Sequence, residues 1–407
     1  MATGTSTSSP GSWWQTLLAL LVVLAVGLAV FVGLPYVFLG STGYMPFISM
    51  KQAWETPVDR AAGEYGNGAW VAGDTVVRSR YDAVTGFDAG SGKERWEYLP
   101  PRRAEICTVS SRADDSVALI VYSEKDKDCV NVAAIDLTDG RELWRTVTAQ
   151  PAAVATGGGL AVVEEGTKAV RVFDLRSGAA RWKAAVPKGC TPDTATAAKK
   201  QVLAVLTCGD ELKLAAFDPA DGAARWTVPL DERQGMPAGA YAGFASADPI
   251  VLRVMNGQEG STLSFTADGR PQGRIERVGD YGTIKDVAVA GGRLFAVATY
   301  QGSQSTLDQI VAFDLASGDE LWREDGGGGG TTPGAFHAEG DRVMYTVNSR
   351  KYGDRLMVFD AATGDEEEDR EFREEPVEAD DLLTYKDLVI AVRSGVGVRP
   401  FTAYERW

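Results

Sequence analysis

The chain has 407 residues, a formal net charge of −15, four cysteines and a single histidine. This acidic balance opposes binding to nucleic acid and to anionic lipid, because both ligands carry negative charge. One histidine cannot build HExxH or multi-histidine metal sites, and the sequence contains no CxxC pair for a zinc ribbon or a thioredoxin-like site.

The N-terminal segment differs in composition from the rest of the chain, since no charged residue precedes Lys51. Residues 1–14 are predicted to form a disordered tail, because their first part is rich in Ser, Thr and Gly. Residues 15–40 are predicted to form a transmembrane helix. Their apolar run would span roughly 35 Å as a helix, and a hydrocarbon core is about 30 Å thick. Residues 41–50 are predicted to be a linker.

A cleaved signal peptide is the alternative to this anchor. Signal peptides usually have a shorter apolar region and a basic start, and this segment has neither, which favours an uncleaved signal-anchor. A lipid-anchored lipoprotein is excluded, because the first cysteine is Cys107.

After Lys51 one ten-residue pattern recurs along the chain. Its clear copies are FDAGSGKERW (87–96), IDLTDGRELW (135–144), FDLRSGAARW (173–182), FDPADGAARW (217–226) and FDLASGDELW (313–322). Degraded copies are FTADG (265–269) and FDAATGDEEE (359–368). Successive copies start 38 to 48 residues apart, a period that is typical of an array of small β units.

Each residue type in the pattern has a structural reason. The Asp can accept backbone N–H bonds in a turn, and a glycine supplies the positive φ that a short hairpin needs. The predicted turn glycines are Gly92, Gly140, Gly178, Gly222, Gly318 and Gly364. A Trp on the returning strand can be buried between neighbouring sheets. These tryptophans are Trp96, Trp144, Trp182, Trp226 and Trp322.

Short apolar runs before each copy complete a four-stranded unit. Eight such sets begin near Ala69, Ile106, Ala153, Thr191, Phe244, Val287, Phe336 and Leu382. The last set ends without room for a fourth strand, and residues 51–58 (KQAWETPV) resemble the fourth-strand segments. We therefore predict that this segment, with Trp54, closes the eighth unit and removes an open sheet edge. The alternative is seven units with the last segment as the closing strand.

The motif resembles the PQQ-type (pyrroloquinoline quinone) repeat of β-propellers, and the similarity covers residues 51–407. That family includes quinoprotein dehydrogenases, the β-propeller lipoprotein of the outer-membrane-protein assembly complex and many bacterial surface proteins. WD40 repeats carry a Gly-His element that cannot recur here, because His337 is the only histidine. The expected fold is all-β: an eight-bladed β-propeller after a single transmembrane helix.

The four cysteines form two pairs, each inside one proposed blade: Cys107 with Cys129, and Cys190 with Cys208. We predict two intra-blade disulfides, the alternative being four buried reduced thiols. Disulfides persist in oxidising compartments, which places the propeller on the extracytoplasmic side of the cell membrane. The positive-inside rule weakly favours the opposite orientation, because Lys51 and Arg60 follow the span.

The resulting hypothesis is a membrane-anchored, non-catalytic protein-binding or scaffold propeller with a partner in the bacterial envelope and no cofactor. Candidate recognition loops are the segments that differ most between units: 124–128, 256–261, 301–308 and 349–354. Length drift without function is the other interpretation of these loops.

The alternative hypothesis is a quinoprotein-like dehydrogenase that binds pyrroloquinoline quinone and Ca²⁺. Enzymes of that family use carboxylate and amide ligands, and often a disulfide between adjacent cysteines. No two cysteines are adjacent in this sequence. The glycine run 326–330 lacks the Lys-Ser/Thr of a P-loop, and the acidic stretch 365–381 lacks the spacing of an EF-hand.

Overall fold

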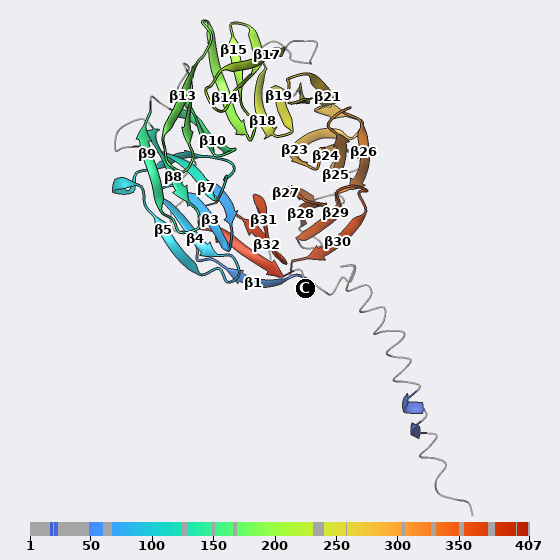
Figure 1. Ribbon diagram of the computed structural model, residues 1–407. Coiled ribbons are helices and arrows are strands. Elements are labelled where there is room, and N and C mark those ends of the chain that lie inside the picture. The colour runs from blue at the N-terminus through green and yellow to red at the C-terminus, as the bar shows by residue number, and fades with distance from the viewer. Residues whose placement is uncertain are drawn as a thin grey trace, which may run out of the picture.

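The described part of the computed structural model forms a ring of eight antiparallel sheets, which we call blades 1 to 8 in chain order (Figure 1). The structure describes residues 17–18, 20–22, 49–59, 67–123, 129–148, 151–165, 169–230, 240–257, 259–302, 306–326, 331–349, 354–372, 379–395 and 397–405. The expected all-β, eight-bladed propeller is confirmed, and the seven-bladed alternative is wrong.

The first four blades are four-stranded meanders. Blade 1 contains β2 (Gly68–Ala72), β3 (Thr75–Arg80), β4 (Ala83–Asp88) and β5 (Glu94–Tyr98), followed by the 3-10 helix η2 (Pro101–Arg103). Blade 2 contains β6 (Ile106–Val109), β7 (Val117–Ser123), β8 (Cys129–Asp136) and β9 (Glu142–Val147). Blade 3 contains β10 (Pro151–Gly157), β11 (Leu160–Glu165), β12 (Ala169–Asp174) and β13 (Ala180–Ala185). Blade 4 contains β14 (Cys190–Ala198), β15 (Gln201–Cys208), β16 (Glu211–Phe217) and β17 (Ala224–Leu230).

The second half of the ring repeats this plan with one addition. Blade 5 contains β18 (Tyr241–Ala247), β19 (Ile250–Asn256), β20 (Glu259–Phe265) and β21 (Pro271–Glu276). Blade 6 contains β23 (Gly282–Ala290), β24 (Arg293–Gln301), β25 (Thr306–Asp314) and β26 (Glu320–Asp325). A short extra strand, β22 (Val278–Gly279), pairs with β23 and was not predicted from the sequence. Blade 7 contains β27 (Thr331–Glu339), β28 (Arg342–Ser349), β29 (Arg355–Asp360) and β30 (Glu366–Glu371).

Blade 8 joins the two ends of the propeller. Three of its strands come from the C-terminal part of the chain, namely β31 (Asp381–Tyr385), β32 (Leu388–Val392) and β33 (Phe401–Glu405). The fourth is β1 (Lys51–Glu55), which pairs antiparallel with β33 so that Trp54 lies opposite Ala403. Figure 1 shows the blue β1 beside the red strands of this blade. Pairing of this kind leaves no open seam in the ring.

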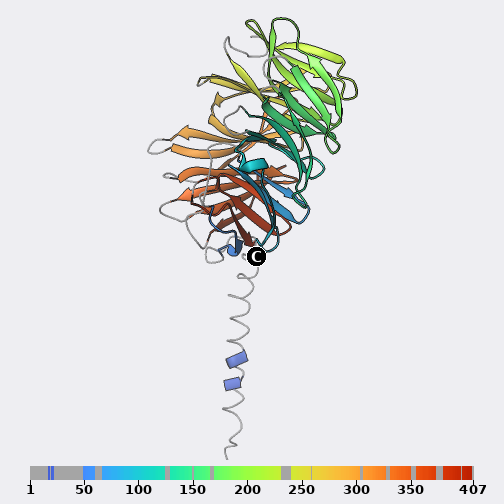
Figure 2. The same cartoon turned by 90° about the vertical axis from the view of Figure 1, so that its left-hand side faces the viewer.

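Burial explains why strands within a blade differ in sequence. Middle strands such as β7 are buried along almost their whole length, because a neighbouring blade covers each of their two faces. Outer strands such as β5 (ERWEY) are largely exposed and carry charge, which discourages edge-to-edge pairing. Eight hydrophobic clusters fill the contacts between neighbouring blades, and we call these contacts seams. Figure 2 shows the ring from the side.

The predicted N-terminal anchor lies mostly outside the described residues. Residues 17–18 and 20–22 are helical, and no described helix is long and apolar enough to cross a membrane. The predicted tail 1–14 and most of the predicted linker 41–50 also lie outside the described residues.

Candidate functional site

The tryptophans of the repeat lie at the seams between blades. The Trp54 Nε1–H donates to the Ala89 carbonyl 3.1 Å away, in the turn of the next blade. A Cβ atom added at Gly92 would lie 2.5 Å from Trp54 Cε3, and Gly92 has φ +68°. Glycine is therefore required for two reasons, the backbone conformation and the close approach of the indole ring.

The same contact recurs around the ring. Each indole N–H donates to the backbone carbonyl of the third residue in the turn motif of the next blade. The pairs are Trp144–Leu175, Trp182–Pro219, Trp226–Ala267 and Trp322–Ala361. The rings pack on turn glycines in the pairs Trp96–Gly140, Trp144–Gly178, Trp182–Gly222, Trp226–Gly269 and Trp322–Gly364. Among the described residues, the Trp96 Nε1 has no hydrogen-bond partner. Gly269, in a degraded copy of the motif, is a member of this set that the sequence analysis did not include.

Gly318 is the exception among the six predicted glycines. It has φ +82°, but a Cβ atom there would approach the Arg274 backbone and no indole ring. Blade 5 has Gly273 at the position that Trp occupies in blades 1 to 4, 6 and 8, and the Gly273 N–H donates to the Leu315 carbonyl at 3.2 Å. The Ser264 hydroxyl also donates to this carbonyl. The seam between blades 5 and 6 thus keeps the turn-motif carbonyl as the acceptor but replaces the indole N–H with a backbone N–H and a hydroxyl.

Both predicted disulfides are confirmed. Cys107 is bonded to Cys129 within blade 2, and Cys190 to Cys208 within blade 4. No free cysteine is present among the described residues. Each bond ties the beginning of the first strand of its blade to a later strand of the same sheet.

The two ends of the blades form two faces of the ring. In an antiparallel meander, the first and third connections emerge at one end, which we call the turn face. The second connections emerge at the other end, which we call the loop face. The four predicted recognition loops are all second connections, so they belong to the loop face. Residues 124–128, 258, 303–305 and 350–353 of these loops lie outside the described residues.

A pocket of about 520 Å³ lies at the turn face of blades 2 to 5. It is lined by the first strands of these blades and by the connections that follow them: residues 108–109, 111–114, 153–158, 194–199 and 244–248. First strands line the centre of the ring (Figure 1), so we call this the axial pocket. No feature in the sequence analysis indicated it.

One wall of the axial pocket is an unusually long connection. Residues 110–116 join β6 to β7, whereas the corresponding connections in the other seven blades have two residues, as in 158–159 and 199–200. All eight of these connections lie within the described residues. The long connection places Ser111, Arg112 and Asp114 on the pocket.

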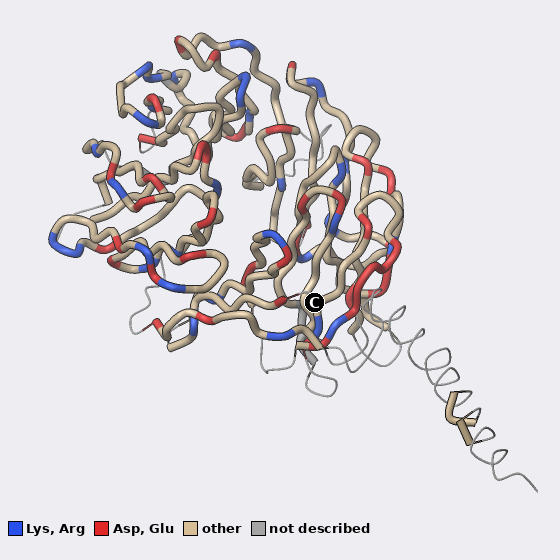
Figure 3. Tube along the Cα trace, turned by 60° about the horizontal axis from the view of Figure 1, so that its bottom comes forward, with Lys and Arg blue, Asp and Glu red and all other residues tan. Residues whose placement is uncertain are grey.

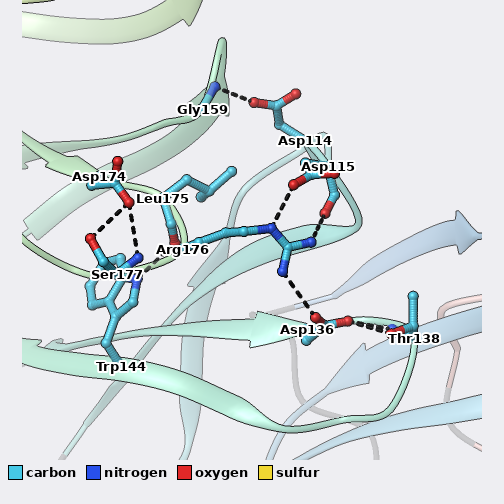
Figure 4. A network of polar contacts seen from close by, with 10 residues as sticks. All are labelled: Asp114, Asp115, Asp136, Thr138, Trp144, Gly159, Asp174, Leu175, Arg176 and Ser177. Carbon is cyan, nitrogen blue, oxygen red and sulfur yellow. Dashed lines mark hydrogen bonds and ion pairs between the residues drawn. The ribbon is translucent and has the colours of Figure 1, made fainter.

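Figure 4 shows how contacts with blade 3 hold this connection in place. The Gly159 N–H donates to Asp114 Oδ2 at 2.7 Å. Arg176 donates to Asp115 through Nε at 2.5 Å and through Nη2 to its carbonyl at 2.8 Å. The third guanidinium nitrogen of Arg176 lies 3.3 Å from Asp136 Oδ2. In addition, the Thr156 hydroxyl donates to the Arg112 carbonyl at 2.7 Å.

Most arginines of the turn motifs are paired with the motif Asp. Arg181 lies 2.7 Å from Asp174, and Arg225 lies 2.6 Å from Asp218. The hydrogen bonds from Arg181 and Ser177 lower the pKa of Asp174 to about 2. These carboxylates therefore remain charged across the physiological range and serve the turns.

A buried acid lies behind the pocket wall formed by β14. The Glu164 side chain is on β11, is 2% exposed and accepts a hydrogen bond from the Ala195 backbone. Burial raises its pKa to about 7, and the nearby Asp193 carboxylate acts in the same direction. Its Oε1 has no partner among the described residues, so the charged form is poorly solvated.

Acidic side chains also gather on the outer strands of blades 6 and 7, and Figure 3 shows them crowded on one side of the ring. Several are paired, as in Arg342–Glu367 at 3.2 Å and Arg355–Asp369. Throughout the described ranges, no group of three His, Cys, Asp or Glu side chains is placed to hold a metal ion. This charged edge discourages strand addition.

Comparisons with known proteins agree on the architecture. The family model of the outer membrane protein assembly factor BamB matches residues 49–189, 129–368 and 306–405. No curated protein sequence matches the chain.

Among solved structures, BamB from Moraxella catarrhalis is 17% identical, with coverage of 88% of this chain and 97% of that one and a TM-score of 0.50. The computationally designed Ika8 protein is 12% identical, covering 87% and 99%, with a TM-score of 0.59. Quinohemoprotein alcohol dehydrogenase ADHIIG from Pseudomonas putida HK5 is 11% identical, covering 89% and 77%, with a TM-score of 0.52. At these identities each likeness shows the fold alone. The family model spans almost the whole propeller, and the chain therefore belongs to the family of the outer membrane protein assembly factor BamB.

Proposed function

We propose that this protein is a non-catalytic protein-binding or scaffold module of the bacterial envelope, anchored by residues 15–40 with its propeller on the extracytoplasmic side. The family match carries the proposal, because an assembly factor acts through contacts with other proteins. A closed, rigid ring supports this role, since it can present variable connections without changing shape. The loop face, where the second connections emerge, is the proposed docking face.

The extracytoplasmic placement is supported by the two disulfides. Structural disulfides are rare in reducing compartments and common in secreted domains. The apolar run within residues 15–40 is long enough for a membrane span and precedes a propeller whose first strand begins at Lys51.

Topology is tested by cysteine labelling on intact cells. Val278 is 57% exposed on β22, so a Val278→Cys variant should react with a membrane-impermeant maleimide before lysis. The matched control is Ser8→Cys in the N-terminal tail, which should react only after lysis. Labelling of Ser8→Cys alone on intact cells would reverse the proposed orientation.

Partner binding is tested by cross-linking intact cells with a membrane-impermeant reagent, followed by mass spectrometry of the proteins joined to the propeller. We expect a specific protein linked to residues of the loop face. Efficient labelling of the propeller with no linked protein would contradict the scaffold role.

A quinoprotein-like dehydrogenase is the second candidate, favoured by the fold shared with quinohemoprotein alcohol dehydrogenase. The described residues offer its Ca²⁺ no cluster of three His, Cys, Asp or Glu side chains placed to hold a metal. Adding pyrroloquinoline quinone and Ca²⁺ to the purified full-length protein tests it. A bound-quinone absorbance with dye-linked alcohol oxidation would overturn the non-catalytic proposal.

A further inference from the structure

The long connection 110–116 of blade 2 is where the ring departs most clearly from its own repeat. In repeat proteins, insertions in single units map to loops on one face, and that face is often the binding face. This insertion contributes side chains to the axial pocket and lies opposite the loop face. It therefore indicates a binding site that is separate from the proposed protein-docking face.

The backbone of this connection is held in a costly conformation. Asp115 has φ +47° and Ser116 has φ +58°, values that residues other than glycine seldom adopt. Strained backbone persists only where the surroundings enforce it, and it gathers at ligand clamps. The bonds from Gly159, Thr156 and Arg176 supply that enforcement. A wall fixed in advance lowers the entropy cost of binding a ligand.

Two cations of the axial pocket differ from the paired arginines of the turn motifs. Arg112 and Lys199 line the pocket, and neither has an acidic partner among the described residues. Arg176, Arg181 and Arg225 on the same face are each paired with Asp. Two unpaired cations in one polar pocket of an acidic protein favour a ligand that brings its own carboxylate.

The remaining polar groups of the pocket define the rest of the ligand. Asp248, in the connection between β18 and β19, also lines the pocket and has no ion-pair partner among the described residues, so its carboxylate can accept N–H groups. The pocket is also bordered by first strands, such as β14, whose inner edges have no neighbouring strand in the sheet. Such edges can accept the main chain of an extended peptide.

We propose that the axial pocket binds a ligand that carries a carboxylate next to N–H donors, with Arg112 and Lys199 holding the carboxylate and Asp248 accepting the N–H groups. This chemistry has two sources, the C-terminal end of a peptide and a free amino acid. The site is independent of the protein-docking role, because it uses the opposite face of the ring.

Isothermal titration calorimetry on the full-length protein in detergent tests the proposal. The probes are N-acetyl-trialanine with a free carboxylate, the same peptide as its C-terminal amide, and free alanine. We expect the free-acid peptide to bind and the amide to bind at least about tenfold more weakly, because a charge-assisted bond is lost. Alanine binding as tightly as the peptide would assign the site to free amino acids, which also supports the proposal.

Variants connect binding to the pocket. Arg112→Gln and Lys199→Gln should each weaken the peptide by about tenfold. The matched control is Lys200→Gln, because Lys200 is exposed beside Lys199 but does not line the pocket. Thermal unfolding checks that all three variants fold like the parent. Equal binding of acid and amide, no binding at millimolar concentration, or affinity unchanged in both pocket variants would overturn the proposal.

Discussion

Two neighbouring seams share one kind of acceptor, a backbone carbonyl of the turn motif, but use different donors. One seam lies between blades 6 and 7, and the other lies between blades 5 and 6. At the first seam, the Trp322 ring packs on Gly364 and its N–H donates to Ala361. At the second seam, Ser264 and the Gly273 backbone donate to Leu315, which holds the corresponding place in its own turn motif. At both of these seams a turn carbonyl is the acceptor, and the indole is one of two donors that satisfy it.

The largest effect is expected at a tryptophan seam. Trp322→Ala should lower the free energy of unfolding by about 3–5 kcal/mol, because it empties a seam site where the ring is 9% exposed and packs near Phe295 and Phe359. Trp322→Phe keeps an aromatic ring but loses the N–H, so it should cost less. Urea unfolding measures both variants. A loss below about 1 kcal/mol for the alanine variant would show that the ring adds little.

At the seam between blades 3 and 4, Glu164 makes the free energy of unfolding depend on pH. Burial raises the pKa of Glu164 to about 7 from the usual value of 4.5 for a glutamate, so the folded state holds this proton more tightly than the unfolded state does. The contribution of protonated Glu164 to the free energy of unfolding is fully present below about pH 4.5. It is lost as the pH rises towards 7, and it amounts to at most about 3 kcal/mol.

Unfolding at several pH values measures this effect. Glu164→Gln should flatten the pH profile and leave the variant more stable than the parent at pH 8. If the free energy of unfolding changed equally with pH in parent and variant, Glu164 would not be the cause of the pH dependence. At the equivalent position of blades 2 and 6, Val121 and Val297 carry no titrating group.

A substitution at Gly269 tests whether contact with an indole ring makes glycine necessary in the turn motif. Gly269→Ala should cost about 1–3 kcal/mol, because φ is +82° and the new Cβ would lie 2.6 Å from Trp226 Cε3. Gly291→Ala is the matched control, since Gly291 has φ +56° with no atom within 4 Å of an added Cβ. Thermal unfolding of the pair separates the two causes, and equal losses would mean that the ring contact contributes nothing.

The smallest effect is expected at the seam between blades 5 and 6, where a hydroxyl and a backbone N–H take the place of the indole. Ser264→Ala removes a hydroxyl bond to Leu315 but leaves the Gly273 N–H at 3.2 Å from the same carbonyl. The loss should be about 1 kcal/mol by urea unfolding. A loss equal to that of Trp322→Ala would show that the hydroxyl alone replaces the whole ring.

The fold was predictable because its information is local and repeated. Each turn motif carries an Asp, a Gly and usually a Trp within ten residues, and all eight predicted first strands overlap or directly adjoin the observed ones. Cys107 and Cys129 could be paired because both fell within one blade. Gly318 has the positive φ that was predicted for it, but the absence of an indole ring against it depends on Gly273 of the preceding blade.

The axial pocket could not be predicted in the same way. Residues 110–116 (SSRADDS) look like an ordinary polar loop, and their length is unusual only beside the two-residue connections of the other blades. Lys199 belongs to one of those short connections, and nothing in the sequence brings it near Arg112. Aligning the blades strand by strand is the signal that would have singled out this connection.

The pairing of β1 with β33 implies an order of assembly. Lys51 and Glu405 are partners although they lie in the first and the last strand of the ring. Trp54, in contrast, bonds to Ala89, only 35 residues away. Strand β1 can therefore pack on blade 1 early, and its other edge stays unpaired until β33 is available. A nascent or truncated chain would carry this half-made seam, and the interval before closure is when it most needs protection from aggregation.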